Sequence, residues 1–332
     1  MFRSQVAQAL ACRVETRLDP FRVLGGGPAG AAAALALRRA GARVVLHEKS
    51  RFPRHKVCGE FFAAEILPLL EQLGVAPDFL ARAPARVTHA ELHFGRTMRR
   101  FQLPEPAFGL SRYAFDDLLL RAALERGAEL SSDEPADPSA VAIVAVGRHT
   151  AAPRGRRVFG FKAHFAGPAN DAVELYFFPG GYCGVCPIEG GRTNVCGLAE
   201  EGLLAREDFR VDRLLAGLRR LAGMQPLTRW YLTGPLCFGP APAVQRGALA
   251  AGDARCFIDP FTGSGLLAAV RTGSWAAEAV AGGPDYHTRC RTLYGRQLST
   301  TSIIRRALSL GWAESLAGLV PGPLLYRLTR PS

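Results

Sequence analysis

A glycine-rich loop near the start of the chain restricts the possible folds more than any other feature. Residues Gly25-Gly26-Gly27-Pro28-Ala29-Gly30 follow the apolar segment 21–24 and open an alanine-rich stretch, 28–40, with helical spacing. In a strand–loop–helix unit of this kind, the first glycine permits a tight turn and the second lets the backbone approach a pyrophosphate. The third allows the helix to pack closely on the strand. We therefore expect a βαβ unit that presents a helix N-terminus to a dinucleotide.

An acidic residue supports the same interpretation. The apolar segment 42–47 is the predicted second strand, and Glu48 ends it, 18 residues after Gly30. A carboxylate at this position accepts hydrogen bonds from both hydroxyl groups of a ribose. We include the neighbouring Lys49 among the predicted cofactor-binding residues.

A later stretch points to the other half of a flavin nucleotide. Gly252-Asp253 follows the predicted strand 246–251, so its carboxylate lies at a strand end, where it can bind ribityl or ribose hydroxyls. Residues 260–265 then begin a long predicted helix, whose free N–H groups can face the flavin C2 carbonyl and N1. Together with the segment 51–60, these stretches predict FAD, rather than FMN, as the cofactor.

The remaining segments predict an α/β protein. Strands occur within βαβ spacing and also in a run of their own, which indicates a Rossmann-like FAD-binding domain, an inserted antiparallel-sheet substrate domain and a C-terminal helical tail. The predicted elements include a hairpin turned at Gly95-Arg96, helices over 113–126 and 206–222, and strands over 141–146, 158–165, 173–178, 182–188, 193–198 and 228–238. The expected divisions are 1–20 for an N-terminal extension, 21–85, 104–150 and 241–300 for the FAD-binding domain, 86–103 and 151–240 for the substrate domain, and 301–332 for the tail.

The basic composition limits the possible partners. The formal net charge is +12, but only three of the 41 basic residues are lysine, and the arginines are scattered without a basic tract. This pattern argues against nucleic-acid binding and leaves attraction to an anionic membrane surface open. The first 20 residues lack the apolar core and cleavage site of a secretory signal. We therefore expect a cytoplasmic protein, with peripheral membrane contact as an alternative.

The cysteine pattern favours structural thiols. Eight cysteines without a signal peptide do not indicate a disulfide framework. Cys183-Gly-Val-Cys186 is a CxxC pair in a predicted strand, where residues three apart point to opposite faces. We expect buried structural cysteines here rather than a redox pair or half of a zinc site, and no metal site elsewhere.

Four further motifs resemble a known superfamily. They are Lys56-Val-Cys58-Gly59-Glu60, Ser111-Arg112-Tyr-Ala-Phe-Asp116, Tyr176-Phe-Phe-Pro-Gly-Gly-Tyr182 and Asp259-Pro260-Phe-Thr-Gly263. With the glycine-rich loop and Gly252-Asp253, they resemble the flavoproteins related to p-hydroxybenzoate hydroxylase and geranylgeranyl reductase. This resemblance implies that FAD is bound by Gly25, Gly27, Pro28, Ala29, Gly30, Glu48, Lys49, Arg54, Arg112, Gly252, Asp253, Pro260, Gly263, Ser264 and Gly265. It also implies that Cys58 lies near the flavin ring, as a proton donor or as a small packed residue.

One motif departs from the family. Hydroxylases of this superfamily have Asp-Gly after a strand, whereas this chain has Val146-Gly147-Arg148. The sequence therefore gives no support for NAD(P)H binding in the hydroxylase manner. A nicotinamide nucleotide and an electron-donor protein remain alternative sources of electrons. The chain also lacks the Trp-x-Trp-x-x-Pro signature of flavin halogenases.

The expected function is an FAD-dependent oxidoreductase that acts on a small apolar organic substrate, such as a polyketide, polyprenyl or lipid-like molecule. Oxygenation by a flavin monooxygenase is the first hypothesis, and reduction of a carbon–carbon double bond is the alternative. A non-catalytic flavin-binding sensor or scaffold is a third hypothesis, of another class. Apolar residues at helical spacing in 302–330 predict an amphipathic helix, which either packs on the FAD-binding domain or lies on a membrane surface.

Overall fold

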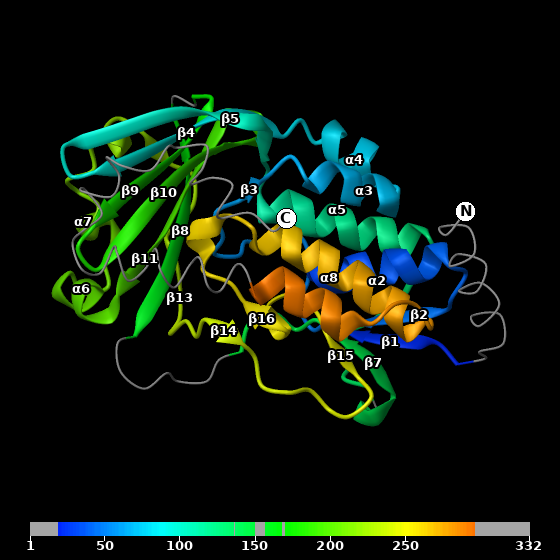
Figure 1. Cartoon of the computed structure of the whole chain (residues 1–332). Helices are drawn as coiled ribbons and strands as arrows, with labels where there is room; N and C mark the ends of the chain where they lie inside the picture. Colours follow the sequence, from blue (N-terminus) through cyan, green and yellow to red (C-terminus); the bar gives the residue numbers. More distant parts are fainter. Residues whose placement is uncertain (1–18, 136, 150–156, 168–169, 296–332) are drawn as a thin grey trace.

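Two sheets organise the computed structural model, which describes residues 19–295 apart from 136, 150–156 and 168–169. A five-stranded parallel sheet carries the glycine-rich loop, and a larger nine-stranded sheet stands beside it (Figure 1). The α/β fold class predicted from the sequence is therefore confirmed. The predicted N-terminal extension and C-terminal tail fall mostly or wholly outside the described residues.

The five-stranded sheet begins with the predicted βαβ unit. Strand β1 (Phe21–Leu24) pairs in parallel with β2 (Val44–His47), and helix α2 (Pro28–Arg39) connects them. The strand order is β15-β7-β1-β2-β6, with β6 at Glu129–Ser131, β7 at Val141–Val144 and β15 at Leu249–Ala250. The loop after β1 thus lies at the carboxyl edge of the central strand, where open α/β sheets bind ligands.

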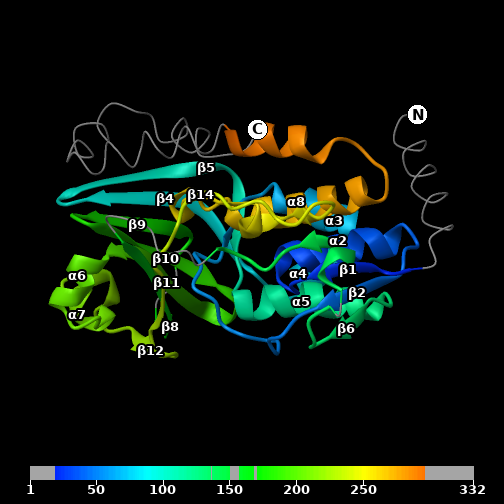
Figure 2. The same ribbon diagram turned by 90° about the horizontal axis from the view of Figure 1, so that it is seen from below.

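Three helices pack together over this sheet (Figure 2). Helix α2 lies between α5 (Arg112–Glu125) and α8 (Gly265–Val280). The alanines at 31–34 of α2 are fully buried, and Gly273 of α8 allows the two backbones to meet, since a Cβ there would lie 2.1 Å from the carbonyl oxygen of Ala29. Two shorter helices, α3 (Ile66–Leu73) and α4 (Ala76–Ala81), complete this layer.

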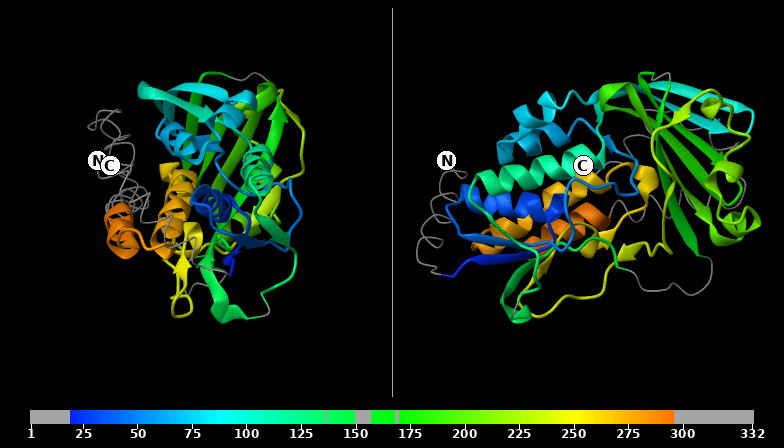
Figure 3. Two further views of the ribbon diagram at one scale, coloured as in Figure 1. Left: turned by 90° about the vertical axis from the view of Figure 1, so that its right-hand side faces the viewer. Right: turned by 180° about the vertical axis from the view of Figure 1, so that it is seen from behind.

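The nine-stranded sheet joins two segments that are distant in sequence (Figure 3). Its order is β12-β8-β11-β10-β9-β4-β5-β3, and β13 also pairs with β8. The hairpin β4 (Ala85–Phe94) and β5 (Thr97–Gly109) turns at Gly95-Arg96, as predicted. The other strands are β3 (Phe61–Phe62), β8 (Val158–Ala166), β9 (Ala172–Phe178), β10 (Gly181–Ile188), β11 (Arg192–Glu200), β12 (Gln225–Pro226) and β13 (Tyr231–Thr233). Because β4 and β9 run in parallel, the sheet is mixed rather than wholly antiparallel.

The predicted helix over 206–222 is wrong. The structure has α6 (Glu201–Arg206), α7 (Val211–Leu214) and a short 3-10 turn, Arg219–Leu221, in this region. Asp208 and Phe209 have φ values of 51° and 55°, which interrupt a right-handed helix. The apolar residues of this region are nevertheless buried together, because Leu204, Val211 and Leu215 pack on one face of the large sheet.

Several other predicted boundaries also shift. The strand predicted over 228–238 shortens to β13, and a short ladder of β14 (Gly239–Pro240) with β16 (Cys256–Phe257) follows it. The strand predicted over 246–251 shortens to β15, because Gly247 has a φ of 92°. Strand β5 extends past the predicted domain boundary at 103/104. Among the helices of the described residues, none is long and apolar enough to cross a membrane.

Candidate functional site

A cavity of about 470 Å³ is lined by residues from both sheets. The smaller sheet contributes the glycine-rich loop, Glu48 and the turn after β7, and the larger sheet contributes β8, β11 and β13. The segment 54–61 and the turns at 251–253 and 257–266 complete the lining. The three stretches that the sequence assigns to a flavin nucleotide therefore meet at one cavity.

The glycines of the loop have different environments. Gly25 has a φ of 101°, and a Cβ there would lie 2.4 Å from the carbonyl oxygen of Ala145. A Cβ on Gly30 would lie 1.8 Å from the carbonyl oxygen of Gly25. Gly27 lines the cavity, and a Cβ there would meet no atom within 4 Å. Gly25 and Gly30 thus shape the turn, while the backbone at Gly27 is open to a ligand at the N-terminus of α2.

Glu48 also faces the cavity. Its carboxylate accepts hydrogen bonds from the backbone N–H of Gly26 (2.9 Å) and of Ser50 (2.7 Å), and Arg54 lies 3.7 Å away. Burial alone would raise the pKa of Glu48, but these donors lower it below its ordinary value. The side chain is therefore a fixed carboxylate that suits ribose hydroxyls. Lys49, in contrast, is exposed and outside the lining, so the structure does not bring it to the cavity.

Two charged residues lie deeper in the cavity. Arg112, at the start of α5, makes two 2.6 Å contacts with Asp116, which raise the pKa of Arg112 although burial opposes the shift. Burial raises the pKa of Asp253, while Arg112, Lys56 and Arg148 lower it. Gly252, which precedes Asp253, has a φ of 61°, and this left-handed conformation shapes the turn after β15.

Lys56 and Arg148 are two cations of the cavity that the sequence-based prediction missed. Lys56 Nζ lies 3.9 Å from the Cβ position of Gly147, so both cations belong to one corner. Burial, together with Arg112 and Arg54, lowers the pKa of Lys56 to about 8. Asp116 pairs with Arg112, and Asp253 faces Lys56 and Arg148, so the three cations still outnumber the two carboxylates, which fits a pyrophosphate. Arg148, which directly follows the Val146-Gly147 that stands where hydroxylases have Asp-Gly, was the signal that could have identified it.

A buried donor gives a second test of the fit. The Nε atom of Arg54 is buried and has no hydrogen-bond partner in the part of the chain that the structure describes. Buried donors are normally paired, so an unpaired one at a cavity wall is consistent with a ligand acceptor. The residues present therefore fit a flavin nucleotide.

The turn before α8 provides the opposite wall. Pro260, Gly263 and Gly265 line the cavity, and Asp259 Oδ1 accepts the N–H of Phe261 at 3.1 Å. Ser264 is fully buried and bonds Thr262 at 2.7 Å, so it supports the turn from behind. Helix α8 begins only at Gly265, after the 3-10 turn Pro260–Thr262.

Cys58 lines the cavity on the segment 54–61. Its carbonyl oxygen accepts a hydrogen bond from Asn194 Nδ2 at 3.0 Å, and its Sγ atom accepts the N–H of Glu60 at 3.5 Å. Burial raises the pKa of Cys58, while Arg112 lowers it, and the first effect prevails. The residue is therefore a protonated thiol beside the predicted flavin site.

Comparison with known proteins supports a flavin cofactor. Residues 20–146 match the family model described as FAD binding domain. This chain is an FAD-binding flavoprotein. It is an FAD-dependent oxidoreductase, and it is similar to the flavoproteins related to p-hydroxybenzoate hydroxylase and geranylgeranyl reductase.

The relatives of this flavoprotein include several kinds of enzyme. It is 26% identical to a menaquinone reductase of Mycolicibacterium smegmatis over 95% of this chain and 89% of the relative. It is 27% identical to digeranylgeranylglycerophospholipid reductase 2 of Methanopyrus kandleri over 78% and 76% of the two chains. The solved structure of the flavin-dependent brominase Bmp2 superposes with a TM-score of 0.75, at 20% identity, over 93% of this chain and 92% of that one. This last likeness shows the fold alone.

A buried trio of charged and polar residues joins the two layers of the flavoprotein. The carboxylate of Glu60 contacts Lys162 Nζ through one oxygen and His164 Nε2, at 2.7 Å, through the other. Glu60 and Lys162 are 0% exposed and His164 is 1% exposed. Burial alone would raise the pKa of Glu60, but Lys162 and His164 lower it.

The trio also fixes the walls of the cavity. Lys162 Nζ donates to the carbonyl oxygen of Lys56 at 3.1 Å, and Glu60 accepts the backbone N–H of Arg112 at 2.6 Å. Strand β8 is thereby connected to the segment 54–61 and to the first residue of α5. Sequence reasoning missed this trio, although a lysine and a histidine two apart on a buried strand are an unusual signal.

A second, smaller cavity of about 110 Å³ adjoins the first. We call it the apolar chamber; its lining is Gly59, Phe61, Ala90, Leu92, Phe101, Val173, Leu175, Tyr182, Gly184, Val185, Cys186, Cys196, Pro260, Phe261, Thr262 and Gly263. Gly59, Phe61, Tyr182, Cys196, Pro260 and Gly263 line both cavities. The chamber therefore lies between the large sheet and the turn before α8.

Cys183 and Cys186 lie on opposite faces of β10, as their spacing predicted. Cys183 packs in the cluster under α6 and α7, and Cys186 lines the apolar chamber. Both are free thiols, and burial raises the pKa of each well above its ordinary value. These properties are typical of structural cysteines.

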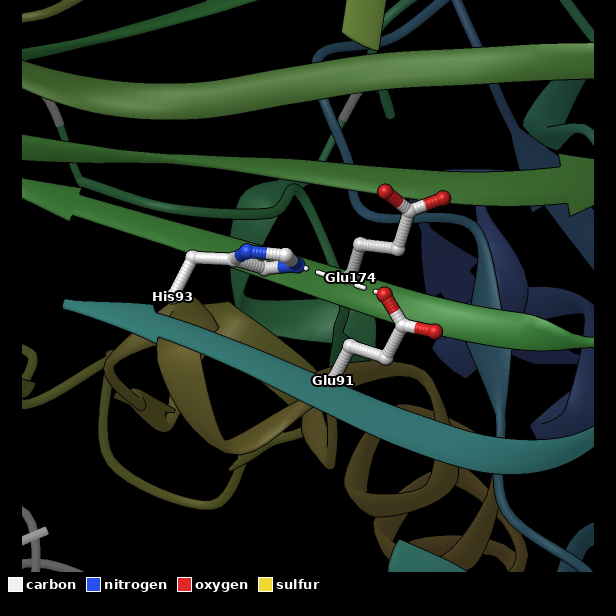
Figure 4. A group of neighbouring side chains, drawn as sticks. All are labelled: Glu91, His93 and Glu174. Carbon is white, nitrogen blue, oxygen red and sulfur yellow. Dashed lines mark hydrogen bonds and ion pairs between the residues drawn. The ribbon is translucent and has the colours of Figure 1, made fainter. Parts of the chain in front are cut away.

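Glu91, His93 and Glu174 form a group with ligand types that suit a metal (Figure 4). Each carboxylate already has a cationic partner, because Arg100 contacts Glu91 and Arg220 lies 2.8 Å from Glu174. The group also lies on the face of the sheet opposite the apolar chamber, since Ala90 and Leu92 line the chamber and Glu91 alternates with them. We interpret it as an ion-pair cluster.

Proposed function

We propose that this flavoprotein reduces a carbon–carbon double bond in an apolar, isoprenoid-like or lipid-like substrate. One observation carries the proposal, namely the apolar chamber that shares its wall with the cofactor cavity. The described residues that line the chamber include no side chain that is charged at neutral pH. A charged group placed there would lose its hydration without a compensating partner, whereas an apolar group gains from leaving water.

The roles of individual residues follow from their positions. Gly27 and the N-terminus of α2 would hold the pyrophosphate with Arg54, Lys56 and Arg148, and Glu48 would bind the adenosine ribose. When bound, FAD supplies the hydride chemistry that no side chain can provide. Asp253 would accept hydrogen bonds from ribityl hydroxyls. The rest of the site orients the substrate and excludes water.

The junction of the two cavities also offers a proton donor. Cys58 lines the cofactor cavity, and Cys196 lines both cavities. Burial raises the pKa of both thiols, so each holds its proton at Sγ near neutral pH. Reduction of a double bond requires one proton in addition to a hydride, and either thiol can donate it. The alternative that Cys58 is a small packing residue is tested by substitution.

Two of the relatives support reduction over oxygenation. The two relatives described above are both named reductases, and the substrates in their names carry isoprenoid chains. Oxygenation, the first hypothesis from the sequence, becomes the second candidate. The electron donor is proposed to be a nicotinamide nucleotide or a donor protein, and contact with an anionic membrane surface is a further proposal.

Anaerobic turnover tests this function directly. The purified holoprotein would be reduced with dithionite or NADPH without oxygen, and geranylgeraniol would then be added. We expect the flavin absorbance to return without oxygen and the product to gain two hydrogen atoms by mass spectrometry. Reoxidation that requires oxygen, with oxygen incorporated into the product, would instead establish oxygenation. A flavin that no donor reduces would favour the non-catalytic hypothesis.

A further inference from the structure

We infer that the apolar chamber admits a single small acyclic group, about the size of one isoprene unit, and that Gly184 and Phe101 set this limit. The inference rests on the proposed function, because it takes the chamber as the place where the reacting part of the substrate binds. It adds a selection rule that the proposed function does not contain: acyclic chains are accepted, and fused rings are excluded.

The size of the chamber gives the first argument. Its volume is about 110 Å³. For comparison, an engineered apolar cavity of about 150 Å³ in another protein holds one benzene molecule. The chamber is therefore smaller than a benzene site. One methyl-branched alkene segment is thin enough to enter, whereas a fused ring system is too wide.

Gly184 makes this space available. It lies within β10 and lines the chamber, whereas its neighbour Cys183 packs in the cluster on the opposite face of the sheet. A Cβ on Gly184 would lie 3.3 Å from Leu175 Cδ2 and 3.5 Å from the carbonyl oxygen of Cys196, both from residues that line the chamber. Gly184 is outside the positive-φ region, so the strand does not need glycine for its backbone conformation. A glycine inside a strand often marks a site where a ligand approaches closely.

Phe101 limits the chamber on the side of the hairpin. Among the lining residues from β4 and β5, which are Ala90, Leu92 and Phe101, it has the largest side chain. It packs against the cluster that contains Phe61, Leu103 and Cys186. Truncation of this ring would therefore extend the chamber toward the hairpin rather than toward the cofactor cavity.

Aromatic contacts keep the remaining wall in place. Phe261, in the turn before α8, contacts Phe177 at 5.7 Å and Tyr182 at 6.3 Å between ring centroids. Phe177 in turn stacks on Phe94 at 4.7 Å. Because packed rings resist displacement, the chamber cannot widen easily for a larger ligand. The chamber is therefore narrow, and the aromatic residues of its wall hold one another in place, which together give the selection rule.

Ligand binding to the oxidised holoprotein tests the inference without turnover. Perturbation of the visible flavin spectrum would be titrated with geraniol, as an acyclic probe, and with anthraquinone, as a fused-ring probe. We expect wild-type protein to bind geraniol and not anthraquinone. G184V should weaken geraniol binding by at least about tenfold, since small changes of volume in an apolar pocket have effects of this order. F101A should gain anthraquinone binding.

Controls separate folding effects from selection. G217V is the matched control, because Gly217 is exposed and a Cβ there meets no atom within 4 Å; it should leave both titrations unchanged. G184A is the milder variant and should weaken geraniol binding less than G184V does. If G184V loses its flavin, G184A carries the test alone. Equal binding of both probes by wild-type protein, or unchanged geraniol binding in G184V and G184A, would overturn the inference. Correct selection without double-bond reduction would overturn only the proposed function.

Discussion

Replacement of Glu60 by glutamine tests whether the buried trio holds the two layers together. The change keeps the shape of the side chain but removes the charge that faces Lys162. Because both side chains are 0% exposed, solvent cannot compensate the remaining ammonium group. Removal of one partner of a buried ion pair costs about 3–5 kcal/mol. We expect E60Q to lose about this much of its free energy of unfolding at neutral pH, measured by urea denaturation and circular dichroism.

A mutant cycle sharpens this prediction. K162M should cost less than E60Q, because His164 and the N–H of Arg112 still bind the carboxylate. The double variant E60Q/K162M should also cost less than E60Q alone, since it leaves no uncompensated charge. E201Q is the control, because Glu201 pairs with Arg157 at the surface and such pairs contribute at most about 1 kcal/mol.

The dependence on pH has a defined sign. The folded-state pKa of Glu60 is lowered, so its contribution to stability is present above the ordinary carboxyl pKa of 4.5 and is lost as the pH falls through the folded value. The difference between wild type and E60Q should therefore shrink in acid. A cost for E60Q within about 0.5 kcal/mol, the range of ordinary surface substitutions, would refute the reasoning.

Four further substitutions test the cofactor site. G27V should abolish FAD binding, because a branched side chain would occupy the open space at the N-terminus of α2; a variant that stays fully yellow would contradict the assignment. R148Q should weaken FAD binding by about tenfold, since a charged hydrogen bond contributes about 1.5–3 kcal/mol. K49Q is the control and should have no effect. Equal FAD affinities of R148Q and wild type in a fluorescence titration would contradict the role of Arg148 at the pyrophosphate. C58S should keep FAD bound but slow turnover in single-turnover kinetics, and unchanged rates would make Cys58 a packing residue.

Local motifs made much of the fold predictable from the sequence. The glycine-rich loop, Glu48 and Asp253 follow apolar strands directly, so their places at strand ends are set by neighbouring residues. The helix predicted over 206–222 failed because apolar spacing does not reveal the positive φ values at Asp208 and Phe209.

The buried trio shows the other limit of sequence reasoning. Glu60 and Lys162 are 102 residues apart, and their contact exists only because the large sheet lies against the segment 54–61. No local pattern contains this information. Lys49 illustrates the reverse case, since its neighbour Glu48 lines the cavity while the lysine side chain lies outside it.

The parallel pairing of β4 with β9 has a consequence for folding and for protein engineering. Residues 89–94 pair with residues 172–177, and the chain between them forms α5, β6 and β7. The large sheet therefore cannot close before much of the nucleotide-binding sheet has been synthesised, and contacts of such high sequence separation form slowly. A chimaera that exchanges only 157–240 with a relative would pair the recipient's hairpin with a foreign β9. Transfer of substrate specificity between this protein and a relative requires exchange of both segments together.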